Sequence, residues 1–304
     1  MSPEQSALDW LLSAQSPEGD IAIFKQLSKR VKNYGEFVGS YPEVTGYCIP
    51  TLIAYDKIDE AERAAEWLVD QQGASGEFMS NNSLVEEDRK GTSVFNSLQI
   101  AVGLEEFPDT IQYGHAAYNW IAKAQNEDGS FDPGNTVVAY NLQYAHADTQ
   151  ARFKKWLRMK LRPNGWFDRT EQYSHLLAYT YIGALQLGMV DEVMEAACHL
   201  RKLVRSVGLP GFIYSDWTGS HEWTCVTGNA QFAELFYTLA KITGNGDYAN
   251  LGYILLQAVE AVQMEDGGFP GSNPVYAPYC PYEAPTWAAK FYLDAKQAER
   301  GIWD

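Results

Sequence analysis

The sequence contains a carboxyl group and a histidine in segments where such groups can act on a small polar molecule. Glu43 lies in SYPEVTGY, where the chain enters a helix. A carboxyl group at such a point acts as a general acid or base when its surroundings bring its pKa near neutrality. A structural carboxylate that complements the helix dipole is the alternative. We expect Glu43 to be the principal acid or base.

Two further residues are candidate partners for Glu43. His175 and Tyr179 are four residues apart and therefore share one helical face, where an imidazole beside a phenol can transfer protons or bind a sugar. A histidine satisfied within the core is the other interpretation. Glu222 precedes another apolar helical segment, and two carboxyl groups across a cavity are the usual requirement for glycoside cleavage. We predict Glu43, His175 and Glu222 as catalytic residues.

Aromatic and amide side chains in the same kind of segment are candidate binding groups. Aromatic rings can stack on sugar rings or line an isoprenoid pocket, although core packing also uses them. The predicted substrate-binding residues are Tyr41, Tyr47, Asn96, Tyr140, Tyr179, Trp217, Tyr282 and Trp287. His221 and Cys225 are too few for a zinc site, so we expect no metal and no cofactor.

These segments alternate with a unit that recurs six times. Each copy is a helical stretch that runs into a turn with glycine and then a bulky apolar residue, as in WLVDQQGASGEF and WIAKAQNEDGSF. From Phe78 the marker phenylalanine recurs at Phe131, Phe167, Phe212 and Phe269, at intervals of 53, 36, 45 and 57 residues. A unit near 50 residues holds two helices of about 12–15 residues and two loops.

The two helices of each unit differ in composition. The predicted outer helices carry charge on one face and cover 3–15, 57–72, 111–126, 149–161, 191–207 and 247–264. The predicted inner helices are poor in charge and cover 43–55, 92–105, 138–148, 174–187, 223–242 and 285–296. We predict an all-α (α/α)6 toroid of six inner and six outer helices, forming one domain over residues 1–304. Parallel inner helices would bring their N-terminal ends to one mouth, where a ligand binds.

The composition restricts the partners and the compartment. The formal net charge is −16, which disfavours nucleic acid, and we expect no membrane span because no stretch approaches 18 apolar residues. The first residues show no basic region followed by an apolar core, and the four cysteines are far apart. We therefore expect a cytoplasmic protein with reduced thiols. The sequence leaves the oligomeric state open.

The repeated turn, a glutamine followed by an acidic residue, a glycine and an aromatic residue, resembles the repeats of squalene/terpene cyclases and protein prenyltransferase β subunits. The resemblance spans the chain and implies the toroid fold rather than an activity. The acidic DxDD run of class II cyclases has no counterpart here. The zinc-binding set of the prenyltransferases, an Asp-x-Cys pair and a distant histidine, is also missing.

Other segments resemble a bacterial family of toroids that accompany surface-polysaccharide genes. The likeness rests on SYPEVTGY, VFNSLQ, SHLLAYTYIGAL, CVTGNAQ and PTWAAKFYLDA. Members of that family have Phe-Asp-Thr-Gly-Gln where this chain has Phe95, Asn96, Ser97, Leu98 and Gln99. The resemblance implies a carbohydrate-related role. If the family aspartate is catalytic, Asn96 implies that this function is lost.

We therefore expect an enzyme that binds a sugar or short glycan and acts on it by acid–base chemistry. Hydrolysis, elimination and epimerisation all fit this chemistry. An isoprenoid-binding or cyclising enzyme is the second hypothesis, against which the missing acidic motifs stand. A non-catalytic glycan-binding protein is the third, and Asn96 is the residue that supports it.

Overall fold

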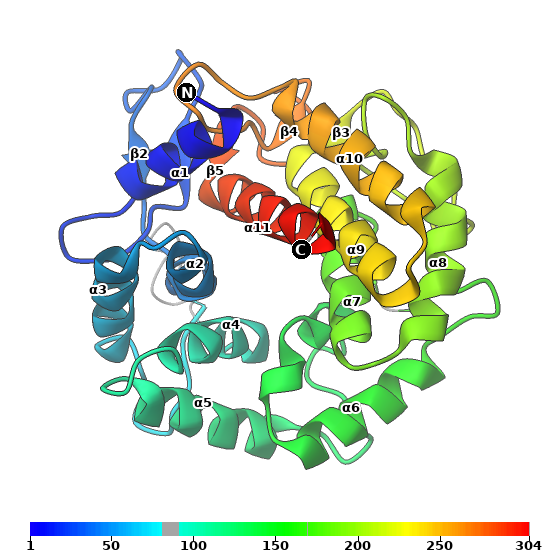
Figure 1. Cartoon of the computed structure of the whole chain (residues 1–304). Coiled ribbons are helices and arrows are strands. Elements are labelled where there is room, and N and C mark those ends of the chain that lie inside the picture. Colours follow the sequence, from blue (N-terminus) through cyan, green and yellow to red (C-terminus); the bar gives the residue numbers. More distant parts are fainter. Residues whose placement is uncertain (81–90, 169, 304) are drawn as a thin grey trace.

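The computed structural model describes residues 1–80, 91–168 and 170–303, and its helices form two concentric layers (Figure 1). The outer layer consists of α1 (Pro3–Ser13), α3 (Ile58–Val69), α5 (Ile111–Ala124), α6 (Ala147–Met159), α8 (Val190–Leu203) and α10 (Gly246–Glu260). The inner layer contains α2 (Pro42–Ala54), α4 (Val94–Leu104), α7 (Ser174–Gln186), α9 (Val226–Thr243) and α11 (Thr286–Trp303). The (α/α)6 toroid is confirmed, with one departure in its inner layer.

The prediction of an inner helix at 138–148 is wrong. The structure has two short 3₁₀ helices there, η2 (Thr136–Ala139) and η3 (Leu142–Tyr144), separated by Tyr140 and by Asn141, which has φ 65°. The interval from Phe131 to Phe167 is the shortest of the repeat, which leaves too little chain for two full helices and their loops. Gly183 of α7 packs so closely on this segment that a Cβ there would lie 2.1 Å from the carbonyl carbon of Ala139. The 3₁₀ pair therefore fills the third inner position.

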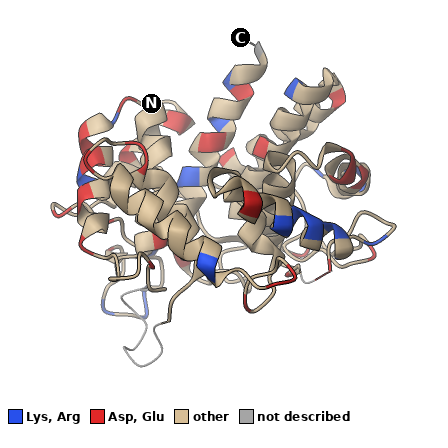
Figure 2. Ribbon diagram, turned by 90° about the horizontal axis from the view of Figure 1, so that it is seen from below, with Lys and Arg blue, Asp and Glu red and all other residues tan. Residues whose placement is uncertain are grey.

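The two layers follow from the distribution of apolar residues along each helix. The outer helix α3 buries one stripe, formed by three alanines and Leu68, and turns its charged residues outward. The inner helix α7 is buried on nearly all sides, since only Leu176 and Gln186 are partly exposed. Lysine and arginine residues gather along the outer helix α6 (Figure 2). No helix of the described ranges has the length and apolarity needed to cross a membrane.

Short strands connect the loops at the N-terminal ends of the inner helices. The strands β1 (Phe24–Gln26), β2 (Phe37–Val38) and β5 (Glu283–Pro285) form an antiparallel sheet in the order β2-β1-β5. The strand β3 (Thr224–Cys225) pairs with β4 (Ser272–Asn273). Because β5 leads directly into α11, its pairing with β1 connects the first and last units of the ring.

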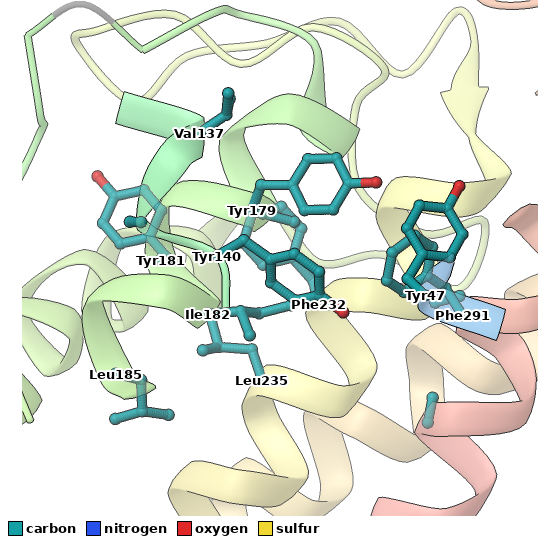
Figure 3. Packing of buried hydrophobic residues seen from close by; sticks show 14 of the residues in the cluster. Tyr47, Val137, Tyr140, Tyr179, Tyr181, Ile182, Leu185, Phe232, Leu235 and Phe291 are labelled. Atoms are coloured by element: carbon teal, nitrogen blue, oxygen red, sulfur yellow. The ribbon is translucent and has the colours of Figure 1, made fainter. Parts of the chain in front are cut away.

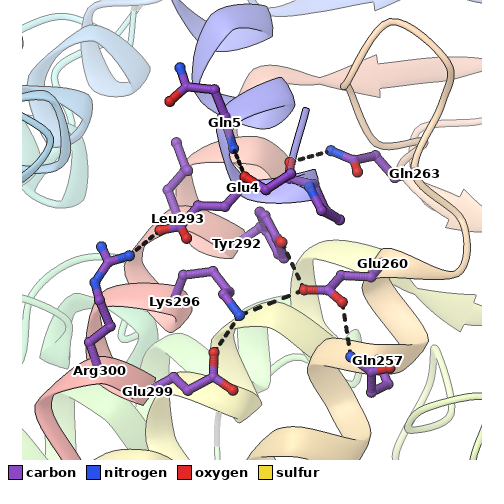
Figure 4. Close-up of polar contacts among 12 residues, drawn as sticks. Glu4, Gln5, Gln257, Glu260, Gln263, Tyr292, Leu293, Lys296, Glu299 and Arg300 are labelled. Atoms are coloured by element: carbon purple, nitrogen blue, oxygen red, sulfur yellow. Dashed lines mark hydrogen bonds and ion pairs between the residues drawn. The ribbon is translucent and has the colours of Figure 1, made fainter.

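The glutamine of the repeated turn connects neighbouring units. In four copies its Nε2 donates to the carbonyl four residues later and to a carbonyl of the next outer helix, the second bond measuring 2.8–3.0 Å. These pairs are Gln15 with Glu60, Gln72 with Tyr113, Gln125 with Thr149, and Gln263 with Pro3. The last pair closes the ring, and Arg300 of α11 pairs with Glu4 beside it (Figure 4).

Replacing Gln263 by alanine is expected to lower the free energy of unfolding by about 1–2 kcal/mol, because the carbonyls of Pro3 and Gly267 lose a shared donor. Chemical denaturation measures the change. Gln257→Ala is the matched control, since this amide lies in α10 and bonds Glu260 at the surface. We expect about 0.5 kcal/mol or less for the control. Equal losses in the two variants would contradict the closing role of Gln263.

Candidate active site

A cavity of about 490 Å³ opens at the N-terminal ends of the inner helices. The first turns of α2, α4, α7 and α11 contribute side chains, and the loop before η2 forms another wall. Predicted site residues that line the cavity are Tyr41, Glu43, Tyr47, Asn96, His175, Tyr179 and Trp287. Parallel packing of the inner helices thus brings together residues from four units of the chain.

Glu43 has the properties of an acid–base group. It lies in the first turn of α2 and is only 8% exposed. Burial raises the pKa of its carboxyl group to about 7, and a hydrogen bond with the Tyr41 hydroxyl opposes that rise only in part. A group with this pKa is partly protonated near neutrality, so it can both give and accept a proton.

A chain of hydrogen bonds from α4 leads to Glu43. The hydroxyl of Ser93 donates to Oδ1 of Asn96 at 2.9 Å, and Nδ2 of Asn96 donates to the Tyr41 hydroxyl at 3.1 Å. Because the Tyr41 oxygen accepts from Asn96, its own proton is free to point at Glu43. An aspartate carboxylate at position 96 has no proton to donate to Tyr41. The amide of Asn96 therefore sets the direction of this chain.

His175 lies in the first turn of α7 and is 6% exposed. Burial lowers the pKa of its imidazole to about 4, and the hydrogen bond to Gln231 opposes this shift. Nδ1 lies 2.8 Å from Oε1 of Gln231, so Nδ1 carries the proton and Nε2 is left as an acceptor. An uncharged imidazole of this kind suits the binding of a hydroxyl group better than it suits proton donation.

Aromatic rings form the floor of the cavity, and Figure 3 shows the packing of four of them, Tyr47, Tyr140, Tyr179 and Phe291. The ring of Tyr179 lies 4.8 Å from that of Tyr140 and 5.6 Å from that of Phe291. Tyr47 also packs on Phe291, with 5.7 Å between ring centroids. Tyr140 contributes to the layer beneath the cavity, where its hydroxyl accepts from Lys290 at 3.1 Å, and it does not line the cavity itself.

Three other predicted site residues lie away from the cavity. Glu222 is exposed in the loop before β3. Trp217 has φ 61°, donates from Nε1 to the carbonyl of Asn164 at 2.8 Å and stacks on His199 of an outer helix. Tyr282 has φ 59° and is 45% exposed. The left-handed backbone at Trp217 and Tyr282 belongs to turns, whereas the sequence prediction assumed regular entry into an inner helix.

The sequence prediction missed several lining residues, of which Asp132 is the most important chemically. Asp132 is an exposed residue in the loop before η2 and adds a second carboxyl group to the walls of the cavity. Tyr279, also missed, accepts a hydrogen bond from Nε1 of Trp287 at 2.7 Å. The Asp-Pro-Gly turn within the shortest repeat interval was the available signal for Asp132.

The described part of the chain contains no group of three or more His, Cys, Asp or Glu residues arranged to hold a metal ion. The polar groups available to a ligand in the cavity are therefore carboxyl, amide, hydroxyl and imidazole groups. Because the pKa of Glu43 lies near neutrality, this set can bind hydroxyl groups and transfer protons.

The buried Glu43 should make stability fall as the pH rises. Its folded pKa of about 7 exceeds the unfolded value of 4.5, so the folded state holds more protons between these values. Its contribution is present below pH 4.5 and is lost as the pH rises through 7. Glu43→Gln removes this dependence, so from pH 4.5 to pH 8 the variant should gain about 3 kcal/mol relative to the native chain. Denaturation at both pH values measures the gain, and parallel pH profiles would contradict the assignment.

No protein-family model and no curated protein matches the sequence. Solved structures do resemble the fold. A D-mannose isomerase gives a TM-score of 0.70 at 11% identity, covering 98% of this chain and 96% of the isomerase. An unsaturated glucuronyl hydrolase specific for heparin gives 0.70 at 12% identity, covering 99% and 96%. The type II terpene cyclase MstE from Scytonema gives 0.65 at 15% identity, covering 97% of each chain.

At these identities the likeness shows the fold alone. The similar structures are toroids that include carbohydrate-active enzymes and a terpene cyclase. The choice between these chemistries therefore depends on the side chains of the cavity.

Proposed function

We propose that this protein is an enzyme that binds a sugar or short glycan in the cavity and acts on it by acid–base chemistry. The observation that carries the proposal is the buried Glu43, with a pKa of about 7, beside a cavity walled by tyrosine and tryptophan rings. The carbohydrate-active enzymes among the similar structures support the same class of substrate. A cytoplasmic role in bacterial surface-polysaccharide metabolism is the biological setting that we propose.

Glu43 is the proposed acid or base. In its protonated form it gives a proton to a leaving or ring oxygen, and in its ionised form it takes one from a carbon or hydroxyl group. The Tyr41 hydroxyl stabilises the ionised form. Asp132 is the proposed second carboxyl group, which would activate water in a hydrolysis. Elimination and epimerisation need only the acid–base action of Glu43.

Several other lining residues are proposed to bind the substrate. Nε2 of His175 accepts a hydrogen bond from a sugar hydroxyl, since its Nδ1 is engaged by Gln231. Tyr47, Tyr179 and Trp287 supply aromatic surface. Asn96 acts by orienting Tyr41. We give Glu222, Trp217 and Tyr282 no role in this proposal, because they lie outside the cavity.

Isoprenoid cyclisation is the second candidate function. A terpene cyclase is among the similar structures. Within the described part of the chain, six aromatic residues line the cavity: Tyr41, Tyr47, Phe95, Tyr179, Tyr279 and Trp287. Glu43 would then have to protonate an alkene. Non-catalytic glycan binding is the third candidate, and it predicts sugar binding without turnover.

A thermal-shift screen separates the classes of ligand. The purified protein is heated with neutral oligosaccharides, uronic-acid oligosaccharides, nucleotide sugars and prenyl diphosphates. A ligand at 100 times its Kd stabilises the fold by about 2.7 kcal/mol, which raises Tm by a few degrees. A shift with a carbohydrate supports the proposal. A shift with prenyl diphosphates alone would overturn it in favour of the second candidate.

A further inference from the structure

Among residues 1–80, 91–168 and 170–303, the ionisable groups that face the cavity are acidic or uncharged. Glu43 and Asp132 supply carboxyl groups, and His175 is held neutral by burial. Every other described lining residue is uncharged, and none is a lysine or arginine. A ligand with a carboxylate, sulfate or phosphate therefore meets no opposite charge on the described walls.

A lysine lies nearby, but it is beneath the aromatic floor. Lys290 is 3% exposed, and its Nζ lies 2.5 Å from Oδ2 of Asp294 and 3.1 Å from the Tyr140 hydroxyl. The ring of Tyr47 lies over the ammonium group, with 5.0 Å from Nζ to the ring centroid. Asp294 and the nearby Glu234 stabilise its positive charge. Lys290 therefore has its own partners and does not line the cavity.

The pair of carboxyl groups suits hydroxyl donors. A neutral sugar offers hydroxyl protons to Glu43, Asp132 and Nε2 of His175, and it presents apolar ring faces to the aromatic residues. An anionic sugar brings a charge of the same sign next to the buried Glu43, where water screens it less than at the surface. Recognition of anionic groups in proteins ordinarily uses arginine or lysine.

We propose that the cavity takes uncharged sugar residues and rejects those that carry a carboxylate, sulfate or phosphate group. This inference rests on the proposed carbohydrate function and adds its substrate class. It sets this protein apart from the similar hydrolase specific for heparin, whose structure shares the fold.

Matched sugars that differ only at C6 test the inference. Methyl glucoside is compared with methyl glucuronide, and methyl galactoside with methyl galacturonide, together with short oligomers of each neutral and acidic kind. Calorimetry at low salt gives Kd at pH 5.5 and pH 8.5. We expect the neutral member of each binding pair to bind at least tenfold more tightly at pH 8.5. The ratio should shrink at pH 5.5, where Glu43 is largely protonated, and in 0.5 M NaCl.

The outcomes separate the two proposals. Equal or tighter binding of the uronide overturns the substrate class and leaves the carbohydrate function standing. Absence of binding by every neutral and acidic sugar overturns the carbohydrate function and, with it, this inference. Preference for the neutral member with no response to pH or salt would contradict the electrostatic basis.

A cation placed at the mouth provides the reciprocal test. Thr92 is an exposed residue that lines the cavity, so Thr92→Lys adds a charge without burying it. The preference for the neutral sugar should fall at least threefold. Thr92→Gln is the matched control, because it adds length without charge and should leave the preference unchanged. An unchanged preference in Thr92→Lys would contradict the proposal.

Discussion

Turnover of a neutral sugar substrate is expected to fall by about 10²–10⁴-fold when Glu43 is replaced by glutamine. The amide has nearly the same shape and still accepts the hydrogen bond from Tyr41, but it cannot exchange a proton at neutral pH. Substrate affinity should therefore change little. Single-turnover kinetics with a direct measurement of Kd separates the two effects. Unchanged turnover would remove Glu43 from the mechanism.

Glu222→Gln tests whether Glu222 is a partner carboxylate, as the sequence predicts, or has no catalytic role, as its position in the structure indicates. Glu222 was expected to be a partner carboxylate, yet it is exposed and does not line the cavity. We expect Glu222→Gln to retain activity and Asp132→Asn to lose it. Loss of turnover in Glu222→Gln with the native fold retained would restore the role that the sequence suggested.

The toroid could be predicted because each repeat carries a recognisable local sequence pattern. Glycine turns, marker phenylalanines and alternating charged and apolar helices recur from one end of the chain to the other. The prediction failed at the third inner position, where the short interval from Phe131 to Phe167 was the available signal. The close approach of Gly183 in α7 to the backbone at Ala139 has no counterpart in the local sequence pattern near residue 138.

The site residues that could be predicted are those whose position follows from the direction of a helix alone. Glu43 and His175 lie in the first turns of α2 and α7, and parallel inner helices bring such turns to one cavity. Trp217 and Tyr282 lie in turns with positive φ, which direct their side chains elsewhere. Asp132 lies in an irregular loop, whose course no helical periodicity could give.

The buried Lys290 should be among the most important single residues for stability. Burial opposes its charged form, but Asp294, Tyr140 and Glu234 more than offset this effect, so the pKa of the ammonium group is raised. Lys290→Ala takes the cation away from Asp294, which is 20% exposed and keeps its hydrogen bond from Thr51, and it leaves a cavity where the lysine packs on Phe291. We expect a loss of about 2–5 kcal/mol in the free energy of unfolding, chiefly from the lost packing and the cavity, measured by chemical denaturation.

Lys296→Ala is the matched control, because Lys296 also pairs with carboxylates, Glu299 of α11 and Glu260 of α10, but is 19% exposed (Figure 4). We expect about 1 kcal/mol or less there, since water replaces the lost partner. Asp294→Asn added to Lys290→Ala removes the unpaired charge and should recover part of the lost stability. An equal loss at both lysines would mean that water replaces the partners of Lys290 as readily as those of Lys296. The rings of Tyr47, Tyr140 and Phe291 would then not separate this positive charge from the water of the cavity, as the preference for neutral sugars requires.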